Sequence, residues 1–247
     1  MREIKSKYPE SLVLFSGDAF SPSLLSGIYK GSQMVKCLNK LTIDAACFGN
    51  HEFDLEPEET DKLVSECNFP WLLGNIRYKG TDETLGKGKP YVIKEIGGKK
   101  VGMFGVGGED WLGILDDYEG ELEYDDAVEY SRKTCQLLRE KEGCDFLIAL
   151  THLREADDRN LAANVSEIDL VLGGHDHMKL QELVNKVPVV KSGDDFESLS
   201  VIKVYEKEQC LTAEFQAERY NFNMKILETP IASDPDLELK GVIDFCW

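Results

Sequence analysis

Short runs of apolar residues bounded by turn residues recur along the first two thirds of the chain. Such runs are typical of strands that are buried on both faces of a sheet. They lie at residues 11–16, 44–48, 70–76, 145–150 and 169–172. Between them, apolar residues recur at helical spacing and predict amphipathic helices. These helical segments are residues 30–41, 57–67, 124–142 and 157–165.

A different pattern follows residue 177, where strand-like runs succeed one another with turn signals between them. These runs cover residues 187–191, 199–205 and 211–220. An earlier pair of runs, 91–96 and 99–106, flanks Gly97-Gly98 and predicts a hairpin. Alternating strands and helices followed by consecutive strands predict two packed sheets with helices outside them. The acidic segment 107–123 is expected to be a mobile loop.

Composition and charge narrow the classes of protein that remain. The 247 residues are enough for one large α/β domain or two small ones. The net charge is −18, from 28 basic and 46 acidic residues, which disfavours nucleic acid and anionic membrane surfaces as partners. The same charge would repel phosphate esters unless bound cations reverse the field locally.

Cysteine usage and hydropathy bear on the compartment. The seven cysteines are scattered and form no C-x-x-C pair, which is typical of reduced thiols in a cytosolic protein. No run approaches the ~18 apolar residues of a membrane span. The first seven residues lack the apolar core of a signal peptide. A cytoplasmic location without membrane partners is therefore expected.

All four histidines fall in short polar segments that follow apolar runs. These segments are Gly49-Asn50-His51-Glu52-Phe53-Asp54, Leu150-Thr151-His152 and Gly173-Gly174-His175-Asp176-His177. A fourth segment, Phe15-Ser16-Gly17-Asp18, supplies a carboxylate. Sites in open α/β sheets collect at the ends of strands, so these side chains are candidates for a common site.

The residue types in these segments are those that bind borderline transition metals. Imidazole nitrogens, a carboxylate and an amide oxygen suit Zn, Mn, Fe or Co. Two such ions about 3.5–4 Å apart would clamp the attacking and leaving oxygens of a phosphoryl displacement. Asp18 is the natural bridging ligand and Asn50 offers a neutral oxygen. His51 is better placed as an acid or a phosphate contact, with Asp54 as its orienting partner.

The specificity of the segments differs. Gly-Asp or Thr-His alone occurs in many proteins without a site. Gly-Asn-His-Glu is more specific, and His175-x-His177 would place both imidazoles on one face of an extended segment. Their order along one chain, namely Asp, Asn-His, His and His-x-His, makes chance a poor explanation.

The successive blocks resemble those of the calcineurin-like metallophosphoesterases, and specifically their 5′-nucleotidase branch. The blocks are GDAFSPS, GNHEFD, THLREADD, GGHDH and VKSGDDFESLS, and the resemblance extends from about residue 1 to residue 235. It implies an α/β fold, the four-layer αββα sandwich of that family, with two divalent metal ions. The small-molecule substrate would be a phosphate ester of the nucleotide class.

Matching position by position, the resemblance implies specific roles for the site residues. Asp18 would bridge the metals. Asn50, His152 and His175 would hold one ion and His177 the other. His51 would act on the transition state, paired with Asp54.

Two departures from the family pattern give further expectations. The family has an Asp-x-His strand upstream of the Gly-Asp block, and its ligands for the ion of His177 are not found here. The sandwich is therefore expected to lack its first strand and to hold one ion well. Residues 1–230 are expected to be a catalytic domain incomplete at its N-terminus. Residues 231–247 would be the remnant of a linker, with the nucleotide-binding C-terminal domain absent.

Three readings of the function remain open at this point. The chain as written could be an impaired 5′-nucleotidase-like hydrolase. It could also be a catalytically inactive module that binds a metal or a partner, or a cyclic-nucleotide phosphodiesterase with the same metal core. The sequence leaves the nucleotide, the metal and the oligomeric state open.

Overall fold

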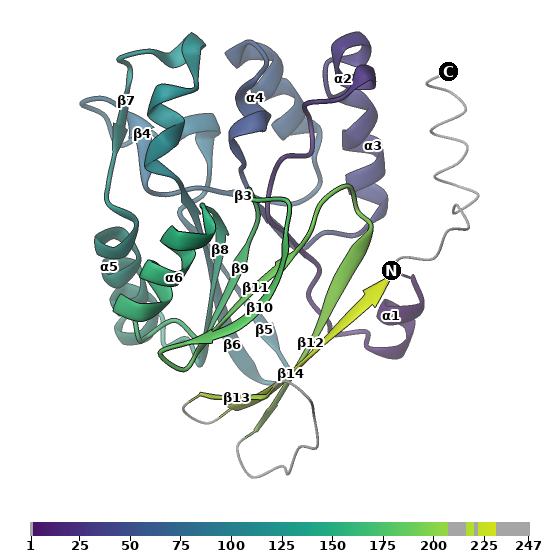
Figure 1. Ribbon diagram of the computed structural model, residues 1–247, viewed down its shortest axis with the longest axis vertical. Coiled ribbons are helices and arrows are strands. Elements are labelled where there is room, and N and C mark those ends of the chain that lie inside the picture. Colours follow the sequence, from purple (N-terminus) through teal and green to yellow (C-terminus); the bar gives the residue numbers. More distant parts are fainter. Residues whose placement is uncertain (1, 207–215, 220–221, 231–247) are drawn as a thin grey trace.

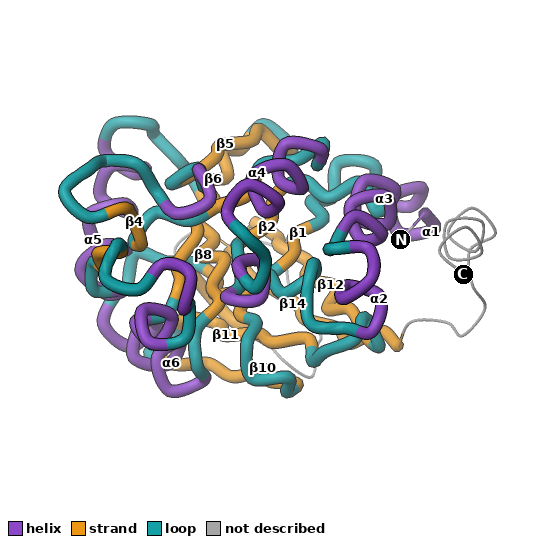
Figure 2. The backbone as a smooth tube through the Cα atoms, turned by 90° about the horizontal axis from the view of Figure 1, so that it is seen from above, coloured by secondary structure: helices purple, strands orange, loops and turns teal. Residues whose placement is uncertain are grey.

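A computed structural model describes residues 2–206, 216–219 and 222–230 of the chain. Figure 2 shows the strands in the middle of the molecule, with helices α5 and α6 at one side and α2 and α3 at the other. The helices are α1 (Arg2–Lys7), α2 (Leu24–Tyr29), α3 (Ser32–Lys40), α4 (Pro57–Glu66), α5 (Ala127–Glu140) and α6 (Glu155–Asn164). No helix in these described ranges is long and apolar enough to cross a membrane.

The first sheet consists of three short parallel strands in the order β1-β2-β3. Their bounds are Leu14–Phe15, Ala45–Cys47 and Trp71–Leu72. The strand predictions at 11–16, 44–48 and 70–76 are confirmed, with shorter limits. Each strand is too short to be stable alone, so packing against the neighbouring layers fixes the sheet.

The second sheet has six strands in the order β10-β11-β9-β8-β6-β5. Its four central strands are parallel, and β10 and β5 pair with them in the antiparallel sense. The bounds are β5 (Tyr91–Ile96), β6 (Lys99–Gly107), β8 (Phe146–His152), β9 (Leu170–Gly173), β10 (Lys179–Val184) and β11 (Val187–Ser192). Every residue of β8 is buried, as expected for a parallel strand covered on both faces.

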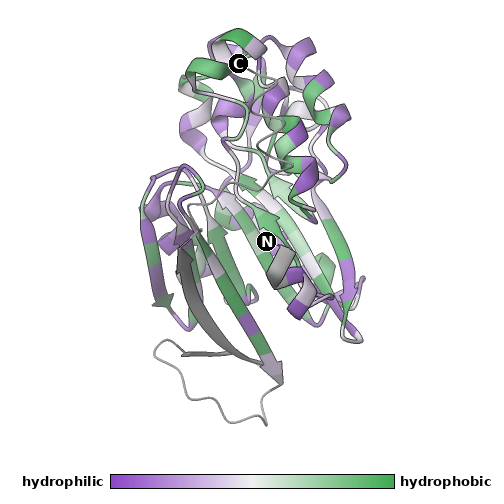
Figure 3. Ribbon diagram, turned by 90° about the vertical axis from the view of Figure 1, so that its right-hand side faces the viewer, coloured by the Kyte–Doolittle hydropathy of each residue, from purple (hydrophilic) through white to green (hydrophobic). Residues whose placement is uncertain are grey.

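Three apolar clusters separate four layers. One lies between the first sheet and α3 and α4, and contains Leu38 and Leu63. A second lies between the six-stranded sheet and α5 and α6, and contains Leu138 and Leu161. A third lies between the two sheets, and Figure 3 shows apolar colour concentrated on their strands. The predicted αββα order of layers is confirmed (Figure 1).

The two sheets lie in close contact at Gly105 of β6. A Cβ atom there would lie 2.3 Å from the carbonyl carbon of Leu72, so only glycine allows this contact. The antiparallel strands β12 (Ser198–Glu206), β14 (Phe222–Pro230) and β13 (Gln216–Arg219) form a further sheet. Strands β4 (Ile76–Tyr78) and β7 (Leu122–Tyr124) pair separately.

Several described segments differ from the predictions, among them β10 and β14, for which no strand was predicted. Helix α2 was not predicted, because Leu24 and Ile28 are exposed and no buried apolar stripe marks the segment. The supposed mobile loop at 107–123 contains short 3₁₀ turns at Glu109–Gly113 and Asp116–Tyr118, and Trp111 is fully buried. Part of the predicted strand 211–220 and all of the predicted linker 231–247 lie outside the described residues. The domain boundary at residue 230 stays a prediction.

Candidate active site

The carboxyl ends of two parallel strands in each of the two sheets supply the candidate residues. Asp18 follows β1, Asn50 and His51 follow β2, His152 ends β8, and His175 follows β9. Because parallel strands direct their carboxyl ends to the same edge, residues that are far apart in the sequence can meet there. The fold therefore brings the loops that carry Asp18, His152 and His175 to one place.

Asp18, His152 and His175 form the centre of the site. One ligand atom from each lies within 4.8 Å of the others, which is close enough to share one metal ion. Asp18 Oδ2 is 2.9 Å from His152 Nε2. The contact lacks hydrogen-bond geometry, and His152 Nε2 has no hydrogen-bond partner. The two atoms are thus placed beside a common point rather than directed at each other.

The tautomer of His152 explains why this point attracts a cation. His152 Nδ1 lies 2.6 Å from the carbonyl oxygen of Ser16, so Nδ1 carries the proton and donates it. Nε2 then presents a lone pair next to the Asp18 carboxylate, and only a proton or a metal ion between them removes the repulsion. Burial opposes protonation of His152, but Asp18 outweighs it and raises the pKa of the imidazole.

Asn50 and His175 both have the properties of ligands for a divalent ion. Asn50 Oδ1 is buried and has no hydrogen-bond partner, as a ligand oxygen would require. Burial and the neighbouring His152 lower the pKa of His175, which keeps its imidazole neutral and able to bind a metal. A carboxylate, two imidazoles and an amide oxygen are the donors that borderline transition metals accept.

Glycines let the loops carrying these residues approach one another. A Cβ atom at Gly49 would lie 2.1 Å from Asp18 Oδ1. At Gly174 it would lie 2.4 Å from the Ser16 carbonyl oxygen and 2.8 Å from His152 Nδ1. Asp18 and His175 themselves adopt positive φ angles of 63° and 77°. Non-glycine residues rarely do so outside constrained sites.

Glu52 is a site residue to which the sequence analysis gave no role. Its fully buried carboxylate accepts hydrogen bonds from the backbone N–H of Asp18 at 2.8 Å and of Gly49 at 2.7 Å. It also accepts N–H groups of Ala19 and Phe20, and so ties the loop after β1 to the loop after β2. Burial and the charge of Asp18 raise the pKa of Glu52 to about 7. An acidic residue three positions after Gly49 was the available signal, because such side chains return to the backbone at helix starts.

His51 faces a different direction from Asn50. Both lie in a 3₁₀ turn, Asn50–Phe53, in which neighbouring residues point about 120° apart. His51 Nδ1 is 2.8 Å from Asp54 Oδ2, and each side chain is 34% exposed. The hydrogen bond with Asp54 raises the pKa of His51, since it favours the imidazolium. The His51 backbone N–H also donates to Asp18 Oδ1 at 3.0 Å.

His177 is not brought into this group within the described part of the chain. Its side chain is 64% exposed, and its Nδ1 lies 3.9 Å from Asp194 Oδ2. Its role as ligand to a second ion stays a prediction. Asp110, which was not singled out, instead lies 3.4 Å from His175 Nε2 and accepts a hydrogen bond from Arg154. The neighbouring Trp111 packs its ring edge-on to His152.

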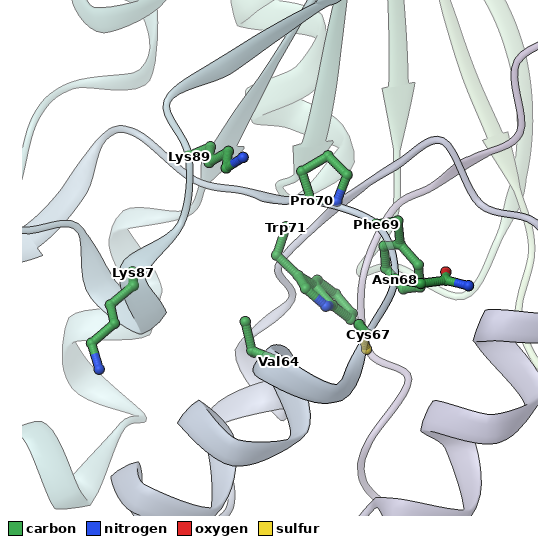
Figure 4. A pocket seen from close by; sticks show the side chains of 8 residues that line it. All are labelled: Val64, Cys67, Asn68, Phe69, Pro70, Trp71, Lys87 and Lys89. Carbon is green, nitrogen blue, oxygen red and sulfur yellow. The ribbon is translucent and has the colours of Figure 1, made fainter.

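A pocket elsewhere does not coincide with this chemistry. It has a volume of about 460 Å³ and lies beside α4, where Phe69, Trp71 and Lys89 line it (Figure 4). None of the candidate site residues borders it. The site is therefore recognised by its donor atoms rather than by the size of a hollow.

Comparisons with known proteins agree with this geometry. A family model described as calcineurin-like phosphoesterase matches residues 1–179. Snake venom 5′-nucleotidase of Crotalus adamanteus is 31% identical over 216 residues, which cover 83% of this chain and 36% of that protein. The trifunctional nucleotide phosphoesterase YfkN of Bacillus subtilis is 29% identical over 223 residues, which cover 78% of this chain and 15% of that protein. The chain thus spans 36% or less of the length of these two relatives.

Solved structures show the same fold. The structure of calcineurin-like phosphoesterase YfkN from Bacillus subtilis matches with a TM-score of 0.83 at 21% identity, covering 99% of this chain and 85% of that one. A 5′-nucleotidase precursor from Thermus thermophilus matches with a TM-score of 0.82 at 21% identity, covering 99% and 50%. The family model, the relatives and the fold agree with the sequence motifs: the chain belongs to the calcineurin-like phosphoesterases.

Proposed function

We propose that this chain hydrolyses phosphate monoesters of the nucleoside 5′-monophosphate class with the help of a divalent metal ion. The observation that supports this most strongly is the Asp18–His152 pair, in which a carboxylate and an imidazole lone pair share one cation position. Family membership supports the reaction class, and the nucleotidase relatives support the substrate class.

Four side chains would hold the ion, namely Asp18, Asn50, His152 and His175. When bound there, a divalent ion would supply positive charge beside the phosphate oxygens, would lower the pKa of a water molecule and would offset the repulsion between an anionic substrate and the chain's net charge of −18.

His51 and Asp54 would act on the leaving group. Asp54 fixes the ring of His51 through Nδ1 and favours its protonated form, in which the opposite ring nitrogen can donate. A water oxygen bonds to phosphorus and releases a proton to solvent as the phosphorus–oxygen ester bond breaks. The departing sugar oxygen takes the proton of His51 and leaves as an alcohol, with phosphate as the other product. A donor placed where charge develops stabilises the transition state more than the ground state.

A catalytically inactive metal-binding module is the second candidate, because His177 stands apart from the metal-site group. With Asp18, Asn50, His152 and His175 as the assigned donors, one tightly bound ion is expected. Titration with Mn²⁺ would check this number. Two equally tight ions would mean that further side chains complete a second position.

The test measures ester hydrolysis by the 247-residue chain loaded with Mn²⁺, with and without EDTA. Free phosphate is measured for AMP and p-nitrophenyl phosphate, and ring opening to adenosine monophosphate is measured by chromatography for 2′,3′-cyclic AMP. We expect EDTA-sensitive release from AMP. His51→Asn should lower turnover by about 10²–10³-fold, as is typical when one transition-state contact is removed. Its Mn²⁺ affinity should be unchanged.

Two control variants make the result specific. Asp54→Asn should lower turnover less than His51→Asn does, because the imidazole is still present and lacks only its orienting partner. Lys62→Gln breaks an exposed pair with Glu59 on α4 and should have no effect. Mn²⁺ binding without hydrolysis of any ester would favour the inactive module. Hydrolysis of the cyclic ester alone would favour a phosphodiesterase.

A further inference from the structure

Lys191 is a buried cation behind the candidate metal site. It lies near the carboxyl end of β11, next to β9 in the six-stranded sheet, and its side chain is 2% exposed. Lysine is almost never fully buried unless it is paired, because removing its charge from water is expensive. Its partners therefore indicate why the chain keeps it there.

The ammonium group hydrogen-bonds to the backbone directly beside both metal-site histidines. Lys191 Nζ donates to the carbonyl oxygen of Leu153 at 2.8 Å and to that of Gly174 at 2.7 Å. Leu153 follows His152, and Gly174 precedes His175. One group thus links the end of β8 to the loop after β9.

Two carboxylates extend the same link. The third N–H of Lys191 donates to Asp176 Oδ2 at 2.7 Å, in the residue after His175. Asp158 Oδ2 of α6 lies 2.8 Å from Nζ, and Asp158 Oδ1 accepts the hydroxyl of Thr151, the residue before His152. The packing is close, since a Cβ atom at Gly173 would lie 2.5 Å from Asp158 Oδ2.

Stability does not account for such a cluster. Replacing a buried ionic group by apolar residues of similar volume is often neutral or stabilising. The contacts instead converge on the two histidines, whose backbone must hold its position for their nitrogens to meet at one ion. Groups that orient metal ligands typically contribute 10- to 100-fold to metal affinity.

We propose that Lys191 is a positioning residue that fixes His152 and His175 for metal binding, through the carbonyl oxygens of Leu153 and Gly174. The inference rests on the proposed metal site. It predicts an effect on metal affinity and coordination geometry that is separate from any effect on folding.

The test variant is Lys191→Met/Asp158→Asn. It removes the ammonium and one carboxylate together, so the net charge of the cluster is unchanged and no fully buried charge is left without its partner. We expect the dissociation constant for Mn²⁺, measured by calorimetry, to rise by about 10–100-fold. The visible absorption of bound Co²⁺ should also shift, since it reports ligand geometry.

The matched control is Arg139→Met/Asp169→Asn. This pair also joins a buried carboxylate to a cation, which here comes from α5. Asp169 directly precedes β9 and so lies at the end of that strand opposite to His175. The control should lower the melting temperature without changing the Mn²⁺ affinity or the Co²⁺ spectrum. Equal weakening of Mn²⁺ binding in both double variants would overturn the proposal.

If the double variant fails to fold, Lys191→Arg is a second test variant, because it keeps the positive charge at position 191. Its planar fork cannot reproduce three donors around one nitrogen, so weaker Mn²⁺ binding is again expected. A folded variant at position 191 with wild-type affinity and spectrum would refute the inference. A wild-type chain that binds no Mn²⁺ would overturn both proposals. A wild-type chain that binds Mn²⁺ but hydrolyses no ester would contradict the proposed function and leave the proposed role of Lys191 intact.

Discussion

The two ends of the parallel strands use the same kinds of side chain in opposite ways. At the amino ends, Asp44, Asp145 and Asp169 each directly precede a strand. Each carboxylate accepts a backbone N–H of the neighbouring strand at 2.8 Å, from Val13, Lys100 and Leu147 respectively. Asp44 and Asp169 are also paired with cations. These aspartates fix the alignment of neighbouring strands.

At the carboxyl ends, some polar atoms of the candidate metal site are buried without such partners. Asn50 Oδ1 and His152 Nε2 have no hydrogen-bond partner, and the Asp18 carboxylate lies directly beside the His152 imidazole. Leaving buried polar atoms unpaired costs about 1–3 kcal/mol each. Buried polar atoms without a hydrogen bond are therefore expected where they bind a ligand. The contrast therefore separates carboxylates that stabilise the fold from those available for chemistry.

The largest expected effect comes from Asp18→Asn. It removes the charge at the shared cation position while keeping the side-chain volume. We expect Mn²⁺ affinity to fall by more than the ~10–100-fold that is typical when a residue that only orients a metal ligand is replaced. Phosphate release should fall with it, and the melting temperature without metal should not decrease. Wild-type Mn²⁺ affinity, measured by calorimetry, would place the ion elsewhere.

Glu52→Gln tests a carboxylate that both accepts backbone hydrogen bonds, like the aspartates at the amino ends, and lies next to the candidate metal site. The amide keeps one acceptor oxygen but turns an NH₂ group toward backbone donors of the loops after β1 and β2. If two N–H groups lose their acceptor, the free energy of unfolding should drop by about 2–6 kcal/mol, at ~1–3 kcal/mol each. Urea denaturation measures this change. Intact stability with altered metal affinity would show that Glu52 serves the site alone.

Asp169→Asn tests the aspartates at the amino ends of the strands, which are expected to stabilise the fold. Removing one partner of a buried pair leaves Arg139 without this carboxylate, and the expected loss of stability is about 3 kcal/mol. Mn²⁺ affinity should stay at the wild-type value because the change lies at the amino end of β9. A drop in affinity as large as that for Asp18→Asn would break the distinction between the two ends.

The smallest effect concerns the pH dependence of stability through Asp44. Burial opposes ionisation of Asp44, but Lys94, the N–H of Val13 and Lys5 outweigh it and lower its pKa below the ordinary 3.8. A lowered pKa stabilises the fold above the unfolded-state pKa, and this contribution is lost as the pH falls through the folded-state value. Asp44→Asn should therefore cost about 1 kcal/mol at pH ~6. The difference from wild type should vanish in urea melts well below pH ~4.

Several features of the fold followed from hydrophobic patterning alone. The buried strands β8 and β9 and the helices α4 and α5 were predicted to within a few residues, because their apolar periodicity reflects contacts along one element. Helix α2 was missed, since its exposed Leu24 and Ile28 give no buried stripe. Its start carries a reciprocal cap between Ser23 and Ser26, a weaker signal than the usual serine-to-glutamate pair.

The sequence by itself determined the residue types available to the candidate site, because ligand types and local spacing are properties of the chain. The strand-end motifs indicated as candidates Asp18, Asn50, His51, Asp54, His152, His175 and His177. Only the tertiary structure decided which donors meet. It brought Asp18, His152 and His175 within 4.8 Å, left His177 exposed, and gave Glu52 and Lys191 their partners. Those partners come from different strands, so no local pattern encodes them. Sheet order and close packing at glycines fix these contacts.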